Sequence, residues 1–320
     1  MQFTRTVIRA ELQRFEEYYK DTLRNDVPLL NNILQYLEQQ KGKQMRPIFV
    51  LLCARLGGAA NERSYRAALL VELLHTASLV HDDMVDDSME RRGAFSVNAL
   101  WKNKVAVLIG DYLFSDGLIL SLSNGDNDIL KTYSAAIRVM IEAELLQMVK
   151  SKKLQASETA YYELINAKTA SFLAAACAAG ASSTFEDATL VKKLHLFGEK
   201  VGMAFQLKDD LFDYGKADVG KPTGNDIKEK KVTLPLIYTI QHADPVLKKK
   251  ILHIVKHQHT DKDKVNFVVE VVNQSGGLQY ATEKMMAYRD EAFQILYTFP
   301  ASPIRSALEE LVRYTTDRAY

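Results

Sequence analysis

The chain has 320 residues, of which 47% are hydrophobic and 25% charged, a composition typical of folded globular proteins rather than disordered or collagen-like ones. Its 41 Lys and Arg residues are balanced by 40 Asp and Glu residues, so the net charge of +1 gives no overall electrostatic attraction for nucleic acid. Only 15 Gly and 7 Pro residues are present, too few turn-forming residues for a many-stranded sandwich or barrel.

Apolar residues recur at helical spacing along the whole chain. Near the N-terminus, Leu12, Phe15, Tyr19 and Leu23 follow one another at three- and four-residue steps. Turn-forming residues divide the chain into roughly ten to twelve helices, with breaks at 26–28, 57–58, 124–126, 180, 215–224, 244–245, 276–277 and 300–303. No strand-like alternation and no linker rich in Pro, Gly or Ser is evident. We therefore predict an all-α fold with a single domain over residues 1–320.

The N-terminal residues and the cysteines indicate a cytoplasmic protein. The first residues lack an apolar core followed by a small-residue cleavage site, so we expect no secretory signal. No run of about 18 uncharged apolar residues exists, so we expect no membrane-spanning helix. Cys53 and Cys177 both lie in apolar helical context, where we expect reduced core residues.

The first of two aspartate clusters ends an apolar helix that we predict to begin near Ser64. The cluster reads His-Asp-Asp-Met-Val-Asp-Asp over residues 81–87. At about 100° per residue, Asp82 and Asp86 lie on one face of the helix, one turn apart. His75 precedes Asp82 by seven residues and lies on nearly the same face.

The second cluster repeats this arrangement. Asp209 and Asp213 have the same one-turn spacing, and Gln206 lies one turn before Asp209. Carboxylates stacked one turn apart repel each other, and the arrangement becomes favourable when a hard divalent cation binds between them. Two such rows on helices that face each other predict several Mg²⁺ ions around one diphosphate. The alternative is two solvated helix faces, which the repeated spacing makes less favourable.

With these clusters, the sequence resembles the trans-polyprenyl diphosphate synthases of the heptaprenyl and octaprenyl type. Further motifs occur in the order typical of that family, at 42–47, 72–75, 91–93, 110–113, 168–170, 202–206, 220–222 and 231–235. One departure is Lys230, where many members have Gly. The resemblance implies a large helical bundle around a central cavity, the isoprenoid synthase type of fold. It also implies an enzyme that condenses isopentenyl diphosphate head to tail with an allylic prenyl diphosphate.

The same resemblance assigns roles to residues. Three Mg²⁺ ions per active site are implied, with Asp82, Asp86 and Asp209 as ligands and Asp83 and Asp213 assisting. Together with Lys168, the carboxylates of Asp82, Asp83, Asp86 and Asp209 form the implied catalytic set. Bound metal would neutralise the diphosphate as it leaves the allylic carbon.

Cationic and polar residues are implied to hold the two diphosphates. The isopentenyl diphosphate site comprises Lys43, Arg46, His75 and Arg92. The allylic diphosphate site comprises Arg91, Lys168, Thr169, Gln206, Lys221 and Lys231, although Lys230 is an alternative to Lys231. Arg suits this role because its planar fork binds phosphate oxygens in pairs. Each residue also has a structural alternative, such as a surface charge near a helix end, a core histidine or a core hydrogen bond.

Small residues before the first cluster bear on product length. Ala77 and Ser78 lie about one turn before Asp82, where family members with short products often have a bulky aromatic residue. Leu74 lies about 12 Å below Asp82 on a helix that offers roughly 27 Å of wall. An extended isoprene unit is about 5 Å long, so five or six units fit, and we predict a product of about seven or eight units if the tunnel bends. The alternative is that Ala77 and Ser78 are small only for helix packing.

Other functions of an all-α chain are less compatible with these residues. A terpene cyclase shares the fold and a first aspartate cluster, but its second metal motif is typically of the Asn/Ser/Glu type. A silent subunit that tunes another synthase would be expected to lose aspartates. A catalytic subunit that needs a small helper chain remains open. We expect a homodimer from the resemblance, no nucleic-acid partner, and at most peripheral membrane contact for product release.

Overall fold

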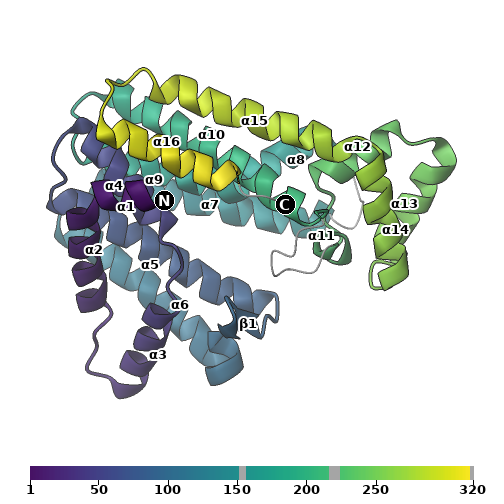
Figure 1. Cartoon of the computed structure of the whole chain (residues 1–320). Coiled ribbons are helices and arrows are strands. Elements are labelled where there is room, and N and C mark those ends of the chain that lie inside the picture. The colour runs from purple at the N-terminus through teal and green to yellow at the C-terminus, as the bar shows by residue number, and fades with distance from the viewer. Residues whose placement is uncertain (151–155, 216–223, 318–320) are drawn as a thin grey trace. The chain divides into compact units, whose positions relative to one another are not determined.

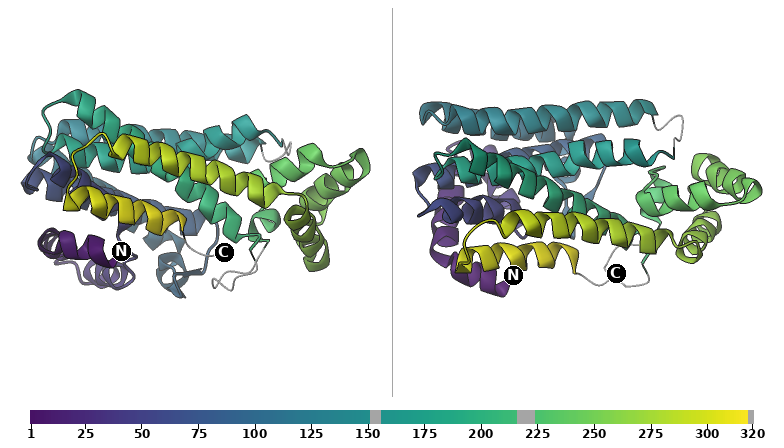
Figure 2. Two further views of the ribbon diagram at one scale, coloured as in Figure 1. Left: turned by 45° about the horizontal axis from the view of Figure 1, so that its top comes forward. Right: turned by 90° about the horizontal axis from the view of Figure 1, so that it is seen from above.

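The computed structural model describes residues 1–150, 156–215 and 224–317, which are almost entirely helical apart from one two-stranded hairpin (Figures 1 and 2). The predicted all-α fold class is therefore confirmed. The chain groups into two compact units. Unit 1 comprises Met1–Ser134, Ala175–His195 and Ser302–Leu308, and unit 2 comprises Ala135–Ala174, Leu196–Ala301 and Glu309–Tyr320. The prediction of a single domain stays a prediction.

Unit 1 is built mainly from the N-terminal helices. In chain order they are α1 (Gln2–Val7), α2 (Arg9–Thr22), α3 (Pro28–Gln39), α4 (Met45–Gly57), α5 (Glu62–Val85) and α6 (Val97–Ser123). The long helix α5 begins with a capping box, in which the Asn61 side chain accepts from the Ser64 backbone N–H and the Ser64 hydroxyl accepts from the Asn61 N–H. The predicted start of this helix near Ser64 is thus correct within two residues.

Helices α5 and α6 pack along each other, and a glycine makes their close approach possible. A Cβ atom added to Gly110 of α6 would lie 2.0 Å from Nε2 of His81, so the imidazole ring occupies the space that a larger residue would need. The ring also contacts the Val107 carbonyl oxygen at 3.3 Å. The first aspartate cluster therefore begins at a residue that is fixed against the neighbouring helix.

A short hairpin that the sequence pattern did not predict follows α5. Strands β1 (Glu90–Arg91) and β2 (Ala94–Phe95) pair in antiparallel orientation, with Arg91 opposite Ala94. Arg92 and Gly93 form the turn, and both have positive φ angles, 55° and 76°. Positive φ at both central residues is the geometry of the tight turns that suit hairpins. Two-residue strands are too short to produce a recognisable alternation, which explains why the pattern was missed.

Unit 2 contains the second half of the helical order. The helices are α8 (Glu158–Ile165), the π-helix η2 (Asn166–Ala170), α11 (Asn225–Lys228), α12 (Leu234–His242), α13 (Pro245–His257), α14 (Lys262–Gln274) and α15 (Gly277–Leu296). Figures 1 and 2 show α13 and α14 as a helical hairpin beside α12. Four helices contribute residues to both units, namely α7 (Asn127–Lys150), α9 (Ser171–Ser182), α10 (Ala188–Phe212) and α16 (Pro303–Thr316).

The π-helix η2 lies where α8 would otherwise continue into α9. A single turn of this kind inside a helix is often associated with a functional site. It carries Lys168 and Thr169, and Ala170 packs against α10, where a Cβ atom on Gly202 would lie 2.5 Å from the Ala170 Cα. Gly202 therefore allows α10 to approach η2 at backbone distance.

Two expectations about helix boundaries need correction. The break predicted at Gly180 is wrong, because Gly180 lies inside α9. A Cβ atom there would lie 2.1 Å from the Val50 carbonyl oxygen, so this glycine serves close packing against α4 rather than a turn. The described residues also form more, shorter helices than the break points predict. The boundary between α1 and α2 at Ile8, for example, has no Gly or Pro to mark it.

Two stretches are long and apolar enough to cross a membrane by length and composition alone. They are Val97–Ser123, whose most apolar stretch is 33% buried, and Glu158–Ser182, whose most apolar stretch is 61% buried. The second stretch combines α8, η2 and α9. Core helices of soluble proteins share this composition, so the finding is weak evidence against the expectation of no spanning helix.

Replacement of Gly110 by Ala tests the close packing of α5 and α6. The added methyl group would overlap the His81 ring, and overpacking of this kind typically costs about 1–3 kcal/mol. We expect Gly110→Ala to lower the free energy of unfolding by about that amount in urea titrations. The double variant with His81→Ala should recover most of the loss. An unchanged stability of Gly110→Ala, or no recovery in the double variant, would contradict this account.

Candidate active site

The first aspartate cluster lies at the C-terminal end of α5, where the carboxylates divide into an exposed and a buried group. Asp82 and Asp86 are exposed, whereas Asp83 is only 4% exposed. The helix ends at Val85, and the Asp86 backbone N–H still donates to the Asp82 carbonyl oxygen at 2.9 Å. The one-turn spacing of Asp82 and Asp86 is therefore helical, as the sequence predicts.

The buried carboxylate of Asp83 is held by Arg91 from strand β1. Nε of Arg91 donates to both carboxylate oxygens, at 2.7 and 2.8 Å, and its Nη2 lies 2.6 Å from Oδ1. Such a multidentate pair satisfies a buried carboxylate that would otherwise be costly. The structure thus brings two predicted site residues together, but it pairs them with each other.

This pair lines a pocket in unit 1 that also contains the cationic side chains of Lys41 and Arg92. Nη1 of Arg46, on α4, lies 2.9 Å from Nε2 of His75, on α5. Because Arg can only donate, the imidazole accepts at Nε2 and carries its proton on Nδ1. Burial and the neighbouring guanidinium groups, Arg46 first, then Arg92, hold the pKa of His75 well below its usual value. His75 is therefore a neutral acceptor that orients Arg46.

Arg92 approaches the same pocket from the turn of the hairpin. Its Nη1 donates to the Gln40 carbonyl oxygen at 3.0 Å. A Cβ atom on Gly42 would lie 2.6 Å from the Arg92 guanidinium carbon, so the glycine leaves room for this side chain. Lys43 is exposed directly after Gly42, and its carbonyl oxygen accepts from Nη2 of Arg5 at 3.0 Å. The predicted isopentenyl diphosphate residues therefore share one unit, in which His75 and Arg92 line the pocket and Arg46 contacts His75.

Glu72 lines the pocket too, and the sequence analysis gave it no role. It is 6% exposed, three residues before His75 on α5. Burial raises the pKa of Glu72, while the positive charges of Arg46 and Arg92 oppose that rise. The available sequence signal was a lone carboxylate within the apolar run Val71–Leu74. Such a residue is almost never fully buried unless it is paired.

The residues predicted to limit product length also lie on α5. Ala77 is fully buried and Leu74 is 3% exposed, whereas Ser78 is only partly buried. The Ser78 hydroxyl donates to the Leu74 carbonyl oxygen at 3.0 Å. The Ser78 hydroxyl proton is therefore hydrogen-bonded within α5. An apolar group could lie against this side chain without leaving that proton unpaired.

In unit 2, four side chains from α8, η2 and α10 are connected by hydrogen bonds. The Thr169 hydroxyl donates to Oε1 of Gln206 at 2.8 Å, and Nε2 of Gln206 donates to Oδ1 of Asp210 at 2.8 Å. The Tyr161 hydroxyl donates to Oδ2 of the same carboxylate at 2.5 Å. Thr169 and Gln206 were predicted together, whereas Tyr161 and Asp210 were missed. Asp210 was available as the second residue of the cluster.

The second cluster has the same division into exposed and buried carboxylates. Asp209 is exposed and Asp210 is 6% exposed, and burial is the main cause that raises the pKa of Asp210 to about 7. Asp213 accepts from the backbone N–H groups of Asn225 and Asp226, at 2.8 and 3.1 Å, and so caps α11. Burial and the neighbouring carboxylates of Asp210 and Asp213 raise the pKa of Asp226 to about 8.

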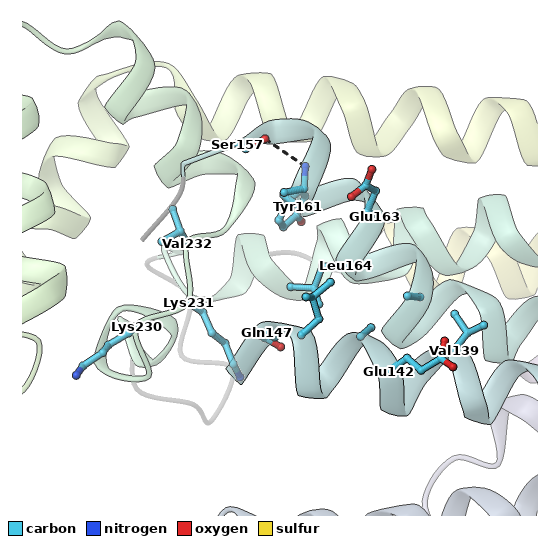
Figure 3. Close-up of a pocket in the computed structure, with 14 residues that line it drawn as sticks. Val139, Glu142, Gln147, Ser157, Tyr161, Glu163, Leu164, Lys230, Lys231 and Val232 are labelled. Atoms are coloured by element: carbon cyan, nitrogen blue, oxygen red, sulfur yellow. Dashed lines mark hydrogen bonds between the residues drawn. The ribbon is translucent and has the colours of Figure 1, made fainter. Parts of the chain in front are cut away.

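Lys168 and Lys231 each form an ion pair within unit 2. Lys168 pairs with Glu144 of α7, and Nζ of Lys231 lies 2.5 Å from Oε2 of Glu229. Figure 3 shows Lys231 extending toward the end of α7 that carries Gln147, whereas Lys230 points away from it. Lys230 has φ of 58°, a backbone conformation that favours glycine.

A divalent metal fits some of these carboxylates better than others. Exposed carboxylate oxygens are the donors that Mg²⁺ prefers, and Asp82, Asp86 and Asp209 offer them. Asp83 and Asp213 have most of their acceptor capacity engaged by Arg91 and by the α11 backbone. Among the residues that the structure describes, no three His, Cys, Asp or Glu side chains close into a complete metal site. The predicted residue Lys221 lies outside the described residues.

The chain is similar in sequence and in structure to polyprenyl diphosphate synthases. The model of the polyprenyl synthetase family matches residues 27–272. The octaprenyl diphosphate synthase of Escherichia coli is 34% identical over 303 residues, covering 93% of each chain. Component 2 of the heptaprenyl diphosphate synthase of Bacillus subtilis is 30% identical, covering 98% of this chain and 89% of that one. A polyprenyl synthase from Caulobacter crescentus, crystallised with calcium and isoprenyl diphosphate, has a TM-score of 0.92 at 34% identity and covers 100% and 98% of the two chains.

The depressed pKa of His75 predicts a distinctive dependence of stability on pH. A histidine whose folded-state pKa lies below its unfolded value has no linkage effect above about pH 6.5, and it costs stability as the pH falls below that value because only the unfolded state binds the proton. We expect His75→Gln, which stays neutral, to gain stability relative to the parent by up to about 1.4 kcal/mol for each pH unit below 6.5. Urea titrations at pH 7.5 and 5.5 measure this, with the exposed His253→Gln as control. Parallel curves for parent and His75→Gln would contradict it.

Proposed function

The chain belongs to the polyprenyl synthetase family, and we propose that it condenses isopentenyl diphosphate head to tail with an allylic prenyl diphosphate. The observation that carries the proposal is the arrangement within unit 1. There the exposed pair Asp82 and Asp86 ends the same helix that contributes His75 to a cationic pocket. Carboxylates for metal and guanidinium groups for phosphate are the two kinds of group that a diphosphate-binding enzyme needs. Prenyltransferase activity follows from the family, and the relatives are named for their heptaprenyl and octaprenyl diphosphate products.

The cationic pocket of unit 1 is proposed to hold isopentenyl diphosphate. Arg92 lines it, Arg46 contacts its lining residue His75, and Lys43 adds an exposed ammonium group nearby in sequence. A neutral His75 keeps Arg46 in place without adding a competing acid. Glu72 offsets part of the positive charge before substrate binds, which limits the repulsion between the two guanidinium groups.

The polar groups of unit 2 are proposed to bind the allylic diphosphate. Lys168, Thr169, Gln206 and Lys231 would contact its oxygens, with Lys231 preferred over Lys230 because of their orientations in Figure 3. Arg91 was also assigned here by the resemblance. Its three contacts with Asp83 support a different role, in which it neutralises that carboxylate next to the exposed pair. Lys221 completes the proposed set from outside the described residues.

Magnesium is the proposed cofactor, held mainly by Asp82, Asp86 and Asp209, with Asp83 and Asp213 as supporting residues and three ions per site. When bound, it supplies Lewis-acid neutralisation of the diphosphate. The allylic C1–O bond breaks, and the diphosphate leaves with the electron pair. The isopentenyl double bond forms the new carbon–carbon bond, and a proton is lost to the departing diphosphate. Protein groups therefore bind and orient the reactants, and none is needed as a dedicated base.

The proposed product is long, about seven or eight units, because Ala77 and Ser78, the residues about one turn before Asp82, have small side chains. The Ser78 hydroxyl donates its proton to a carbonyl oxygen within α5, and the Ala77 side chain is only a methyl group. Burial of each apolar isoprene unit stabilises the growing chain by roughly 25 cal/mol per Å² removed from water. A terpene cyclase is less favoured, since the relatives reported above are named as chain-elongating synthases.

We also propose a cytoplasmic homodimer with one catalytic domain. Four helices contribute to both units, which is unlike two domains joined by a linker. Helix α6 exposes several large apolar side chains, which suits an interface with a second copy, namely Leu100, Leu108, Leu118, Ile119 and Leu122. The component name of the Bacillus subtilis relative keeps a helper chain as the alternative partner.

Incubation of the purified protein with Mg²⁺, isopentenyl diphosphate and farnesyl diphosphate tests the function directly. We expect Mg²⁺-dependent incorporation of isopentenyl units into products that chromatography resolves by length. Absence of any condensation with farnesyl or geranyl diphosphate would remove the proposal for the isolated chain. Activity that appeared only after addition of a second subunit would instead support the two-component alternative.

Replacement of one carboxylate of the exposed pair should nearly abolish turnover. Asp82→Asn removes a negative charge where metal and diphosphate are proposed to meet, and a loss of at least 100-fold in kcat, about 2.7 kcal/mol, is expected. Asp87→Asn is the matched control, since Asp87 is exposed just after the helix but off the Asp82–Asp86 face. The control should retain parental activity. Equal activities for the two variants would disprove the assignment of Asp82.

Product length is tested at Ser78. Ser78→Phe places an aromatic ring one turn below Asp82 and should shorten the product, while Ser78→Ala should leave the length distribution unchanged. The partly buried Ser78 suits this test better than Ala77, because Phe at the fully buried Ala77 would overpack the core. An unchanged product length in an active, stable Ser78→Phe enzyme would place the limiting wall elsewhere.

A further inference from the structure

The hydrogen-bond chain of unit 2 extends beyond the two residues that are proposed to contact substrate. Thr169 and Gln206 form one end, and the bonds continue through Asp210 to Tyr161 at 2.8, 2.8 and 2.5 Å. Neither Tyr161 nor Asp210 has yet a part in the reaction. Both are only 6% exposed, so their polar atoms are committed to one another and to Gln206 rather than to bulk water.

The direction of the chain is set at Asp210, where each of the two carboxyl oxygens accepts one hydrogen bond. Asp210 receives the Tyr161 hydroxyl on one oxygen and the Gln206 amide on the other. The Gln206 nitrogen must therefore face Asp210, which leaves its oxygen to face Thr169. The Thr169 proton is directed to that oxygen. Without the carboxylate, the amide could turn over and exchange its donor and acceptor ends.

The elements that carry the chain are held close to one another. Gly202 of α10 packs closely against Ala170, the residue after Thr169 in η2. A Cβ atom added to Gly202 would lie 2.5 Å from the Ala170 Cα. Tyr161 lies in α8 directly before this π-helix, and it also packs in the apolar cluster of unit 2. The far end of the chain is thus anchored in a packed core, and the near end lies on the helical turn that carries Lys168.

We propose that Tyr161 and Asp210 are positioning residues, which fix the orientation of the Gln206 amide so that its second N–H donates to the allylic diphosphate. The inference rests on the proposed function, in which Thr169 and Gln206 contact that substrate. Like Asp83 in the first cluster, Asp210 is then a buried carboxylate whose oxygens are engaged by neighbouring side chains.

Steady-state kinetics of Tyr161→Phe and Asp210→Asn test the proposal. Hydrogen bonds to a charged group are each worth roughly 10- to 100-fold, so we expect losses of that size in kcat/KM for the allylic diphosphate. The KM for isopentenyl diphosphate and the Mg²⁺ concentration at half-maximal rate should stay within about twofold. Tyr280→Phe is the matched control, because the Tyr280 hydroxyl donates to the Glu158 carboxylate at 2.7 Å outside the chain.

A double-variant cycle distinguishes positioning from stability. Tyr161→Phe and Thr169→Val alter the two ends of the chain, which share no direct hydrogen bond in the network. If the chain acts as a unit, the double variant should be no more than about threefold worse than the poorer single variant. Losses that multiply, or a Tyr161→Phe enzyme that is less heat-stable but kinetically normal, would overturn the proposal. An inactive parent enzyme would instead defeat the proposed function, and this inference with it.

Discussion

The central constraint on this protein is that each aspartate cluster must keep some carboxylates exposed while adjacent ones are buried. A helix turns about 100° per residue, so two consecutive aspartates cannot share one face. Asp82 and Asp209 are exposed, and the next residue in each cluster, Asp83 or Asp210, turns toward the interior. A buried carboxylate without partners would be strongly unfavourable, so each must be satisfied by its surroundings. The rest of the site is arranged around those partners.

The two units satisfy their buried aspartate in different ways. In unit 1, Asp83 is neutralised by the guanidinium group of Arg91, which the hairpin after α5 carries on its first strand. In unit 2, Asp210 accepts from the neutral groups of Tyr161 and Gln206. Neutral donors compensate a buried charge less completely than a cation, which agrees with the raised pKa of Asp210. The cationic Arg91 therefore neutralises the charge of Asp83, whereas the hydrogen bonds of Asp210 orient the side chains that donate to it.

Sequence periodicity predicted the parts of the site that depend on a single helix. The spacing of Asp82 and Asp86 determines their common face, and the same applies to His75, which lies about two turns before Asp82. The family resemblance brought Arg46 and His75 into one substrate site, and the structure shows them in contact. Periodicity could not predict contacts between different helices and strands, because no local sequence pattern depends on them. The pairing of Asp83 with Arg91, the buried Glu72 and the end of the chain at Tyr161 all belong to this class.

Several glycines are likewise explained by contacts with other elements, which the sequence pattern does not reveal. By composition, Gly180 and Gly110 are indistinguishable from turn residues, yet both lie inside helices where another element occupies the space of a side chain. At Gly180 the neighbour is a backbone carbonyl and at Gly110 an imidazole ring, so the sequence gives no sign of which packing requires the glycine. Gly42 differs again, because the group that fills its space is Arg92, a proposed substrate ligand. Close packing at that glycine therefore shapes the cationic pocket itself, and fold and site depend there on the same missing methyl group.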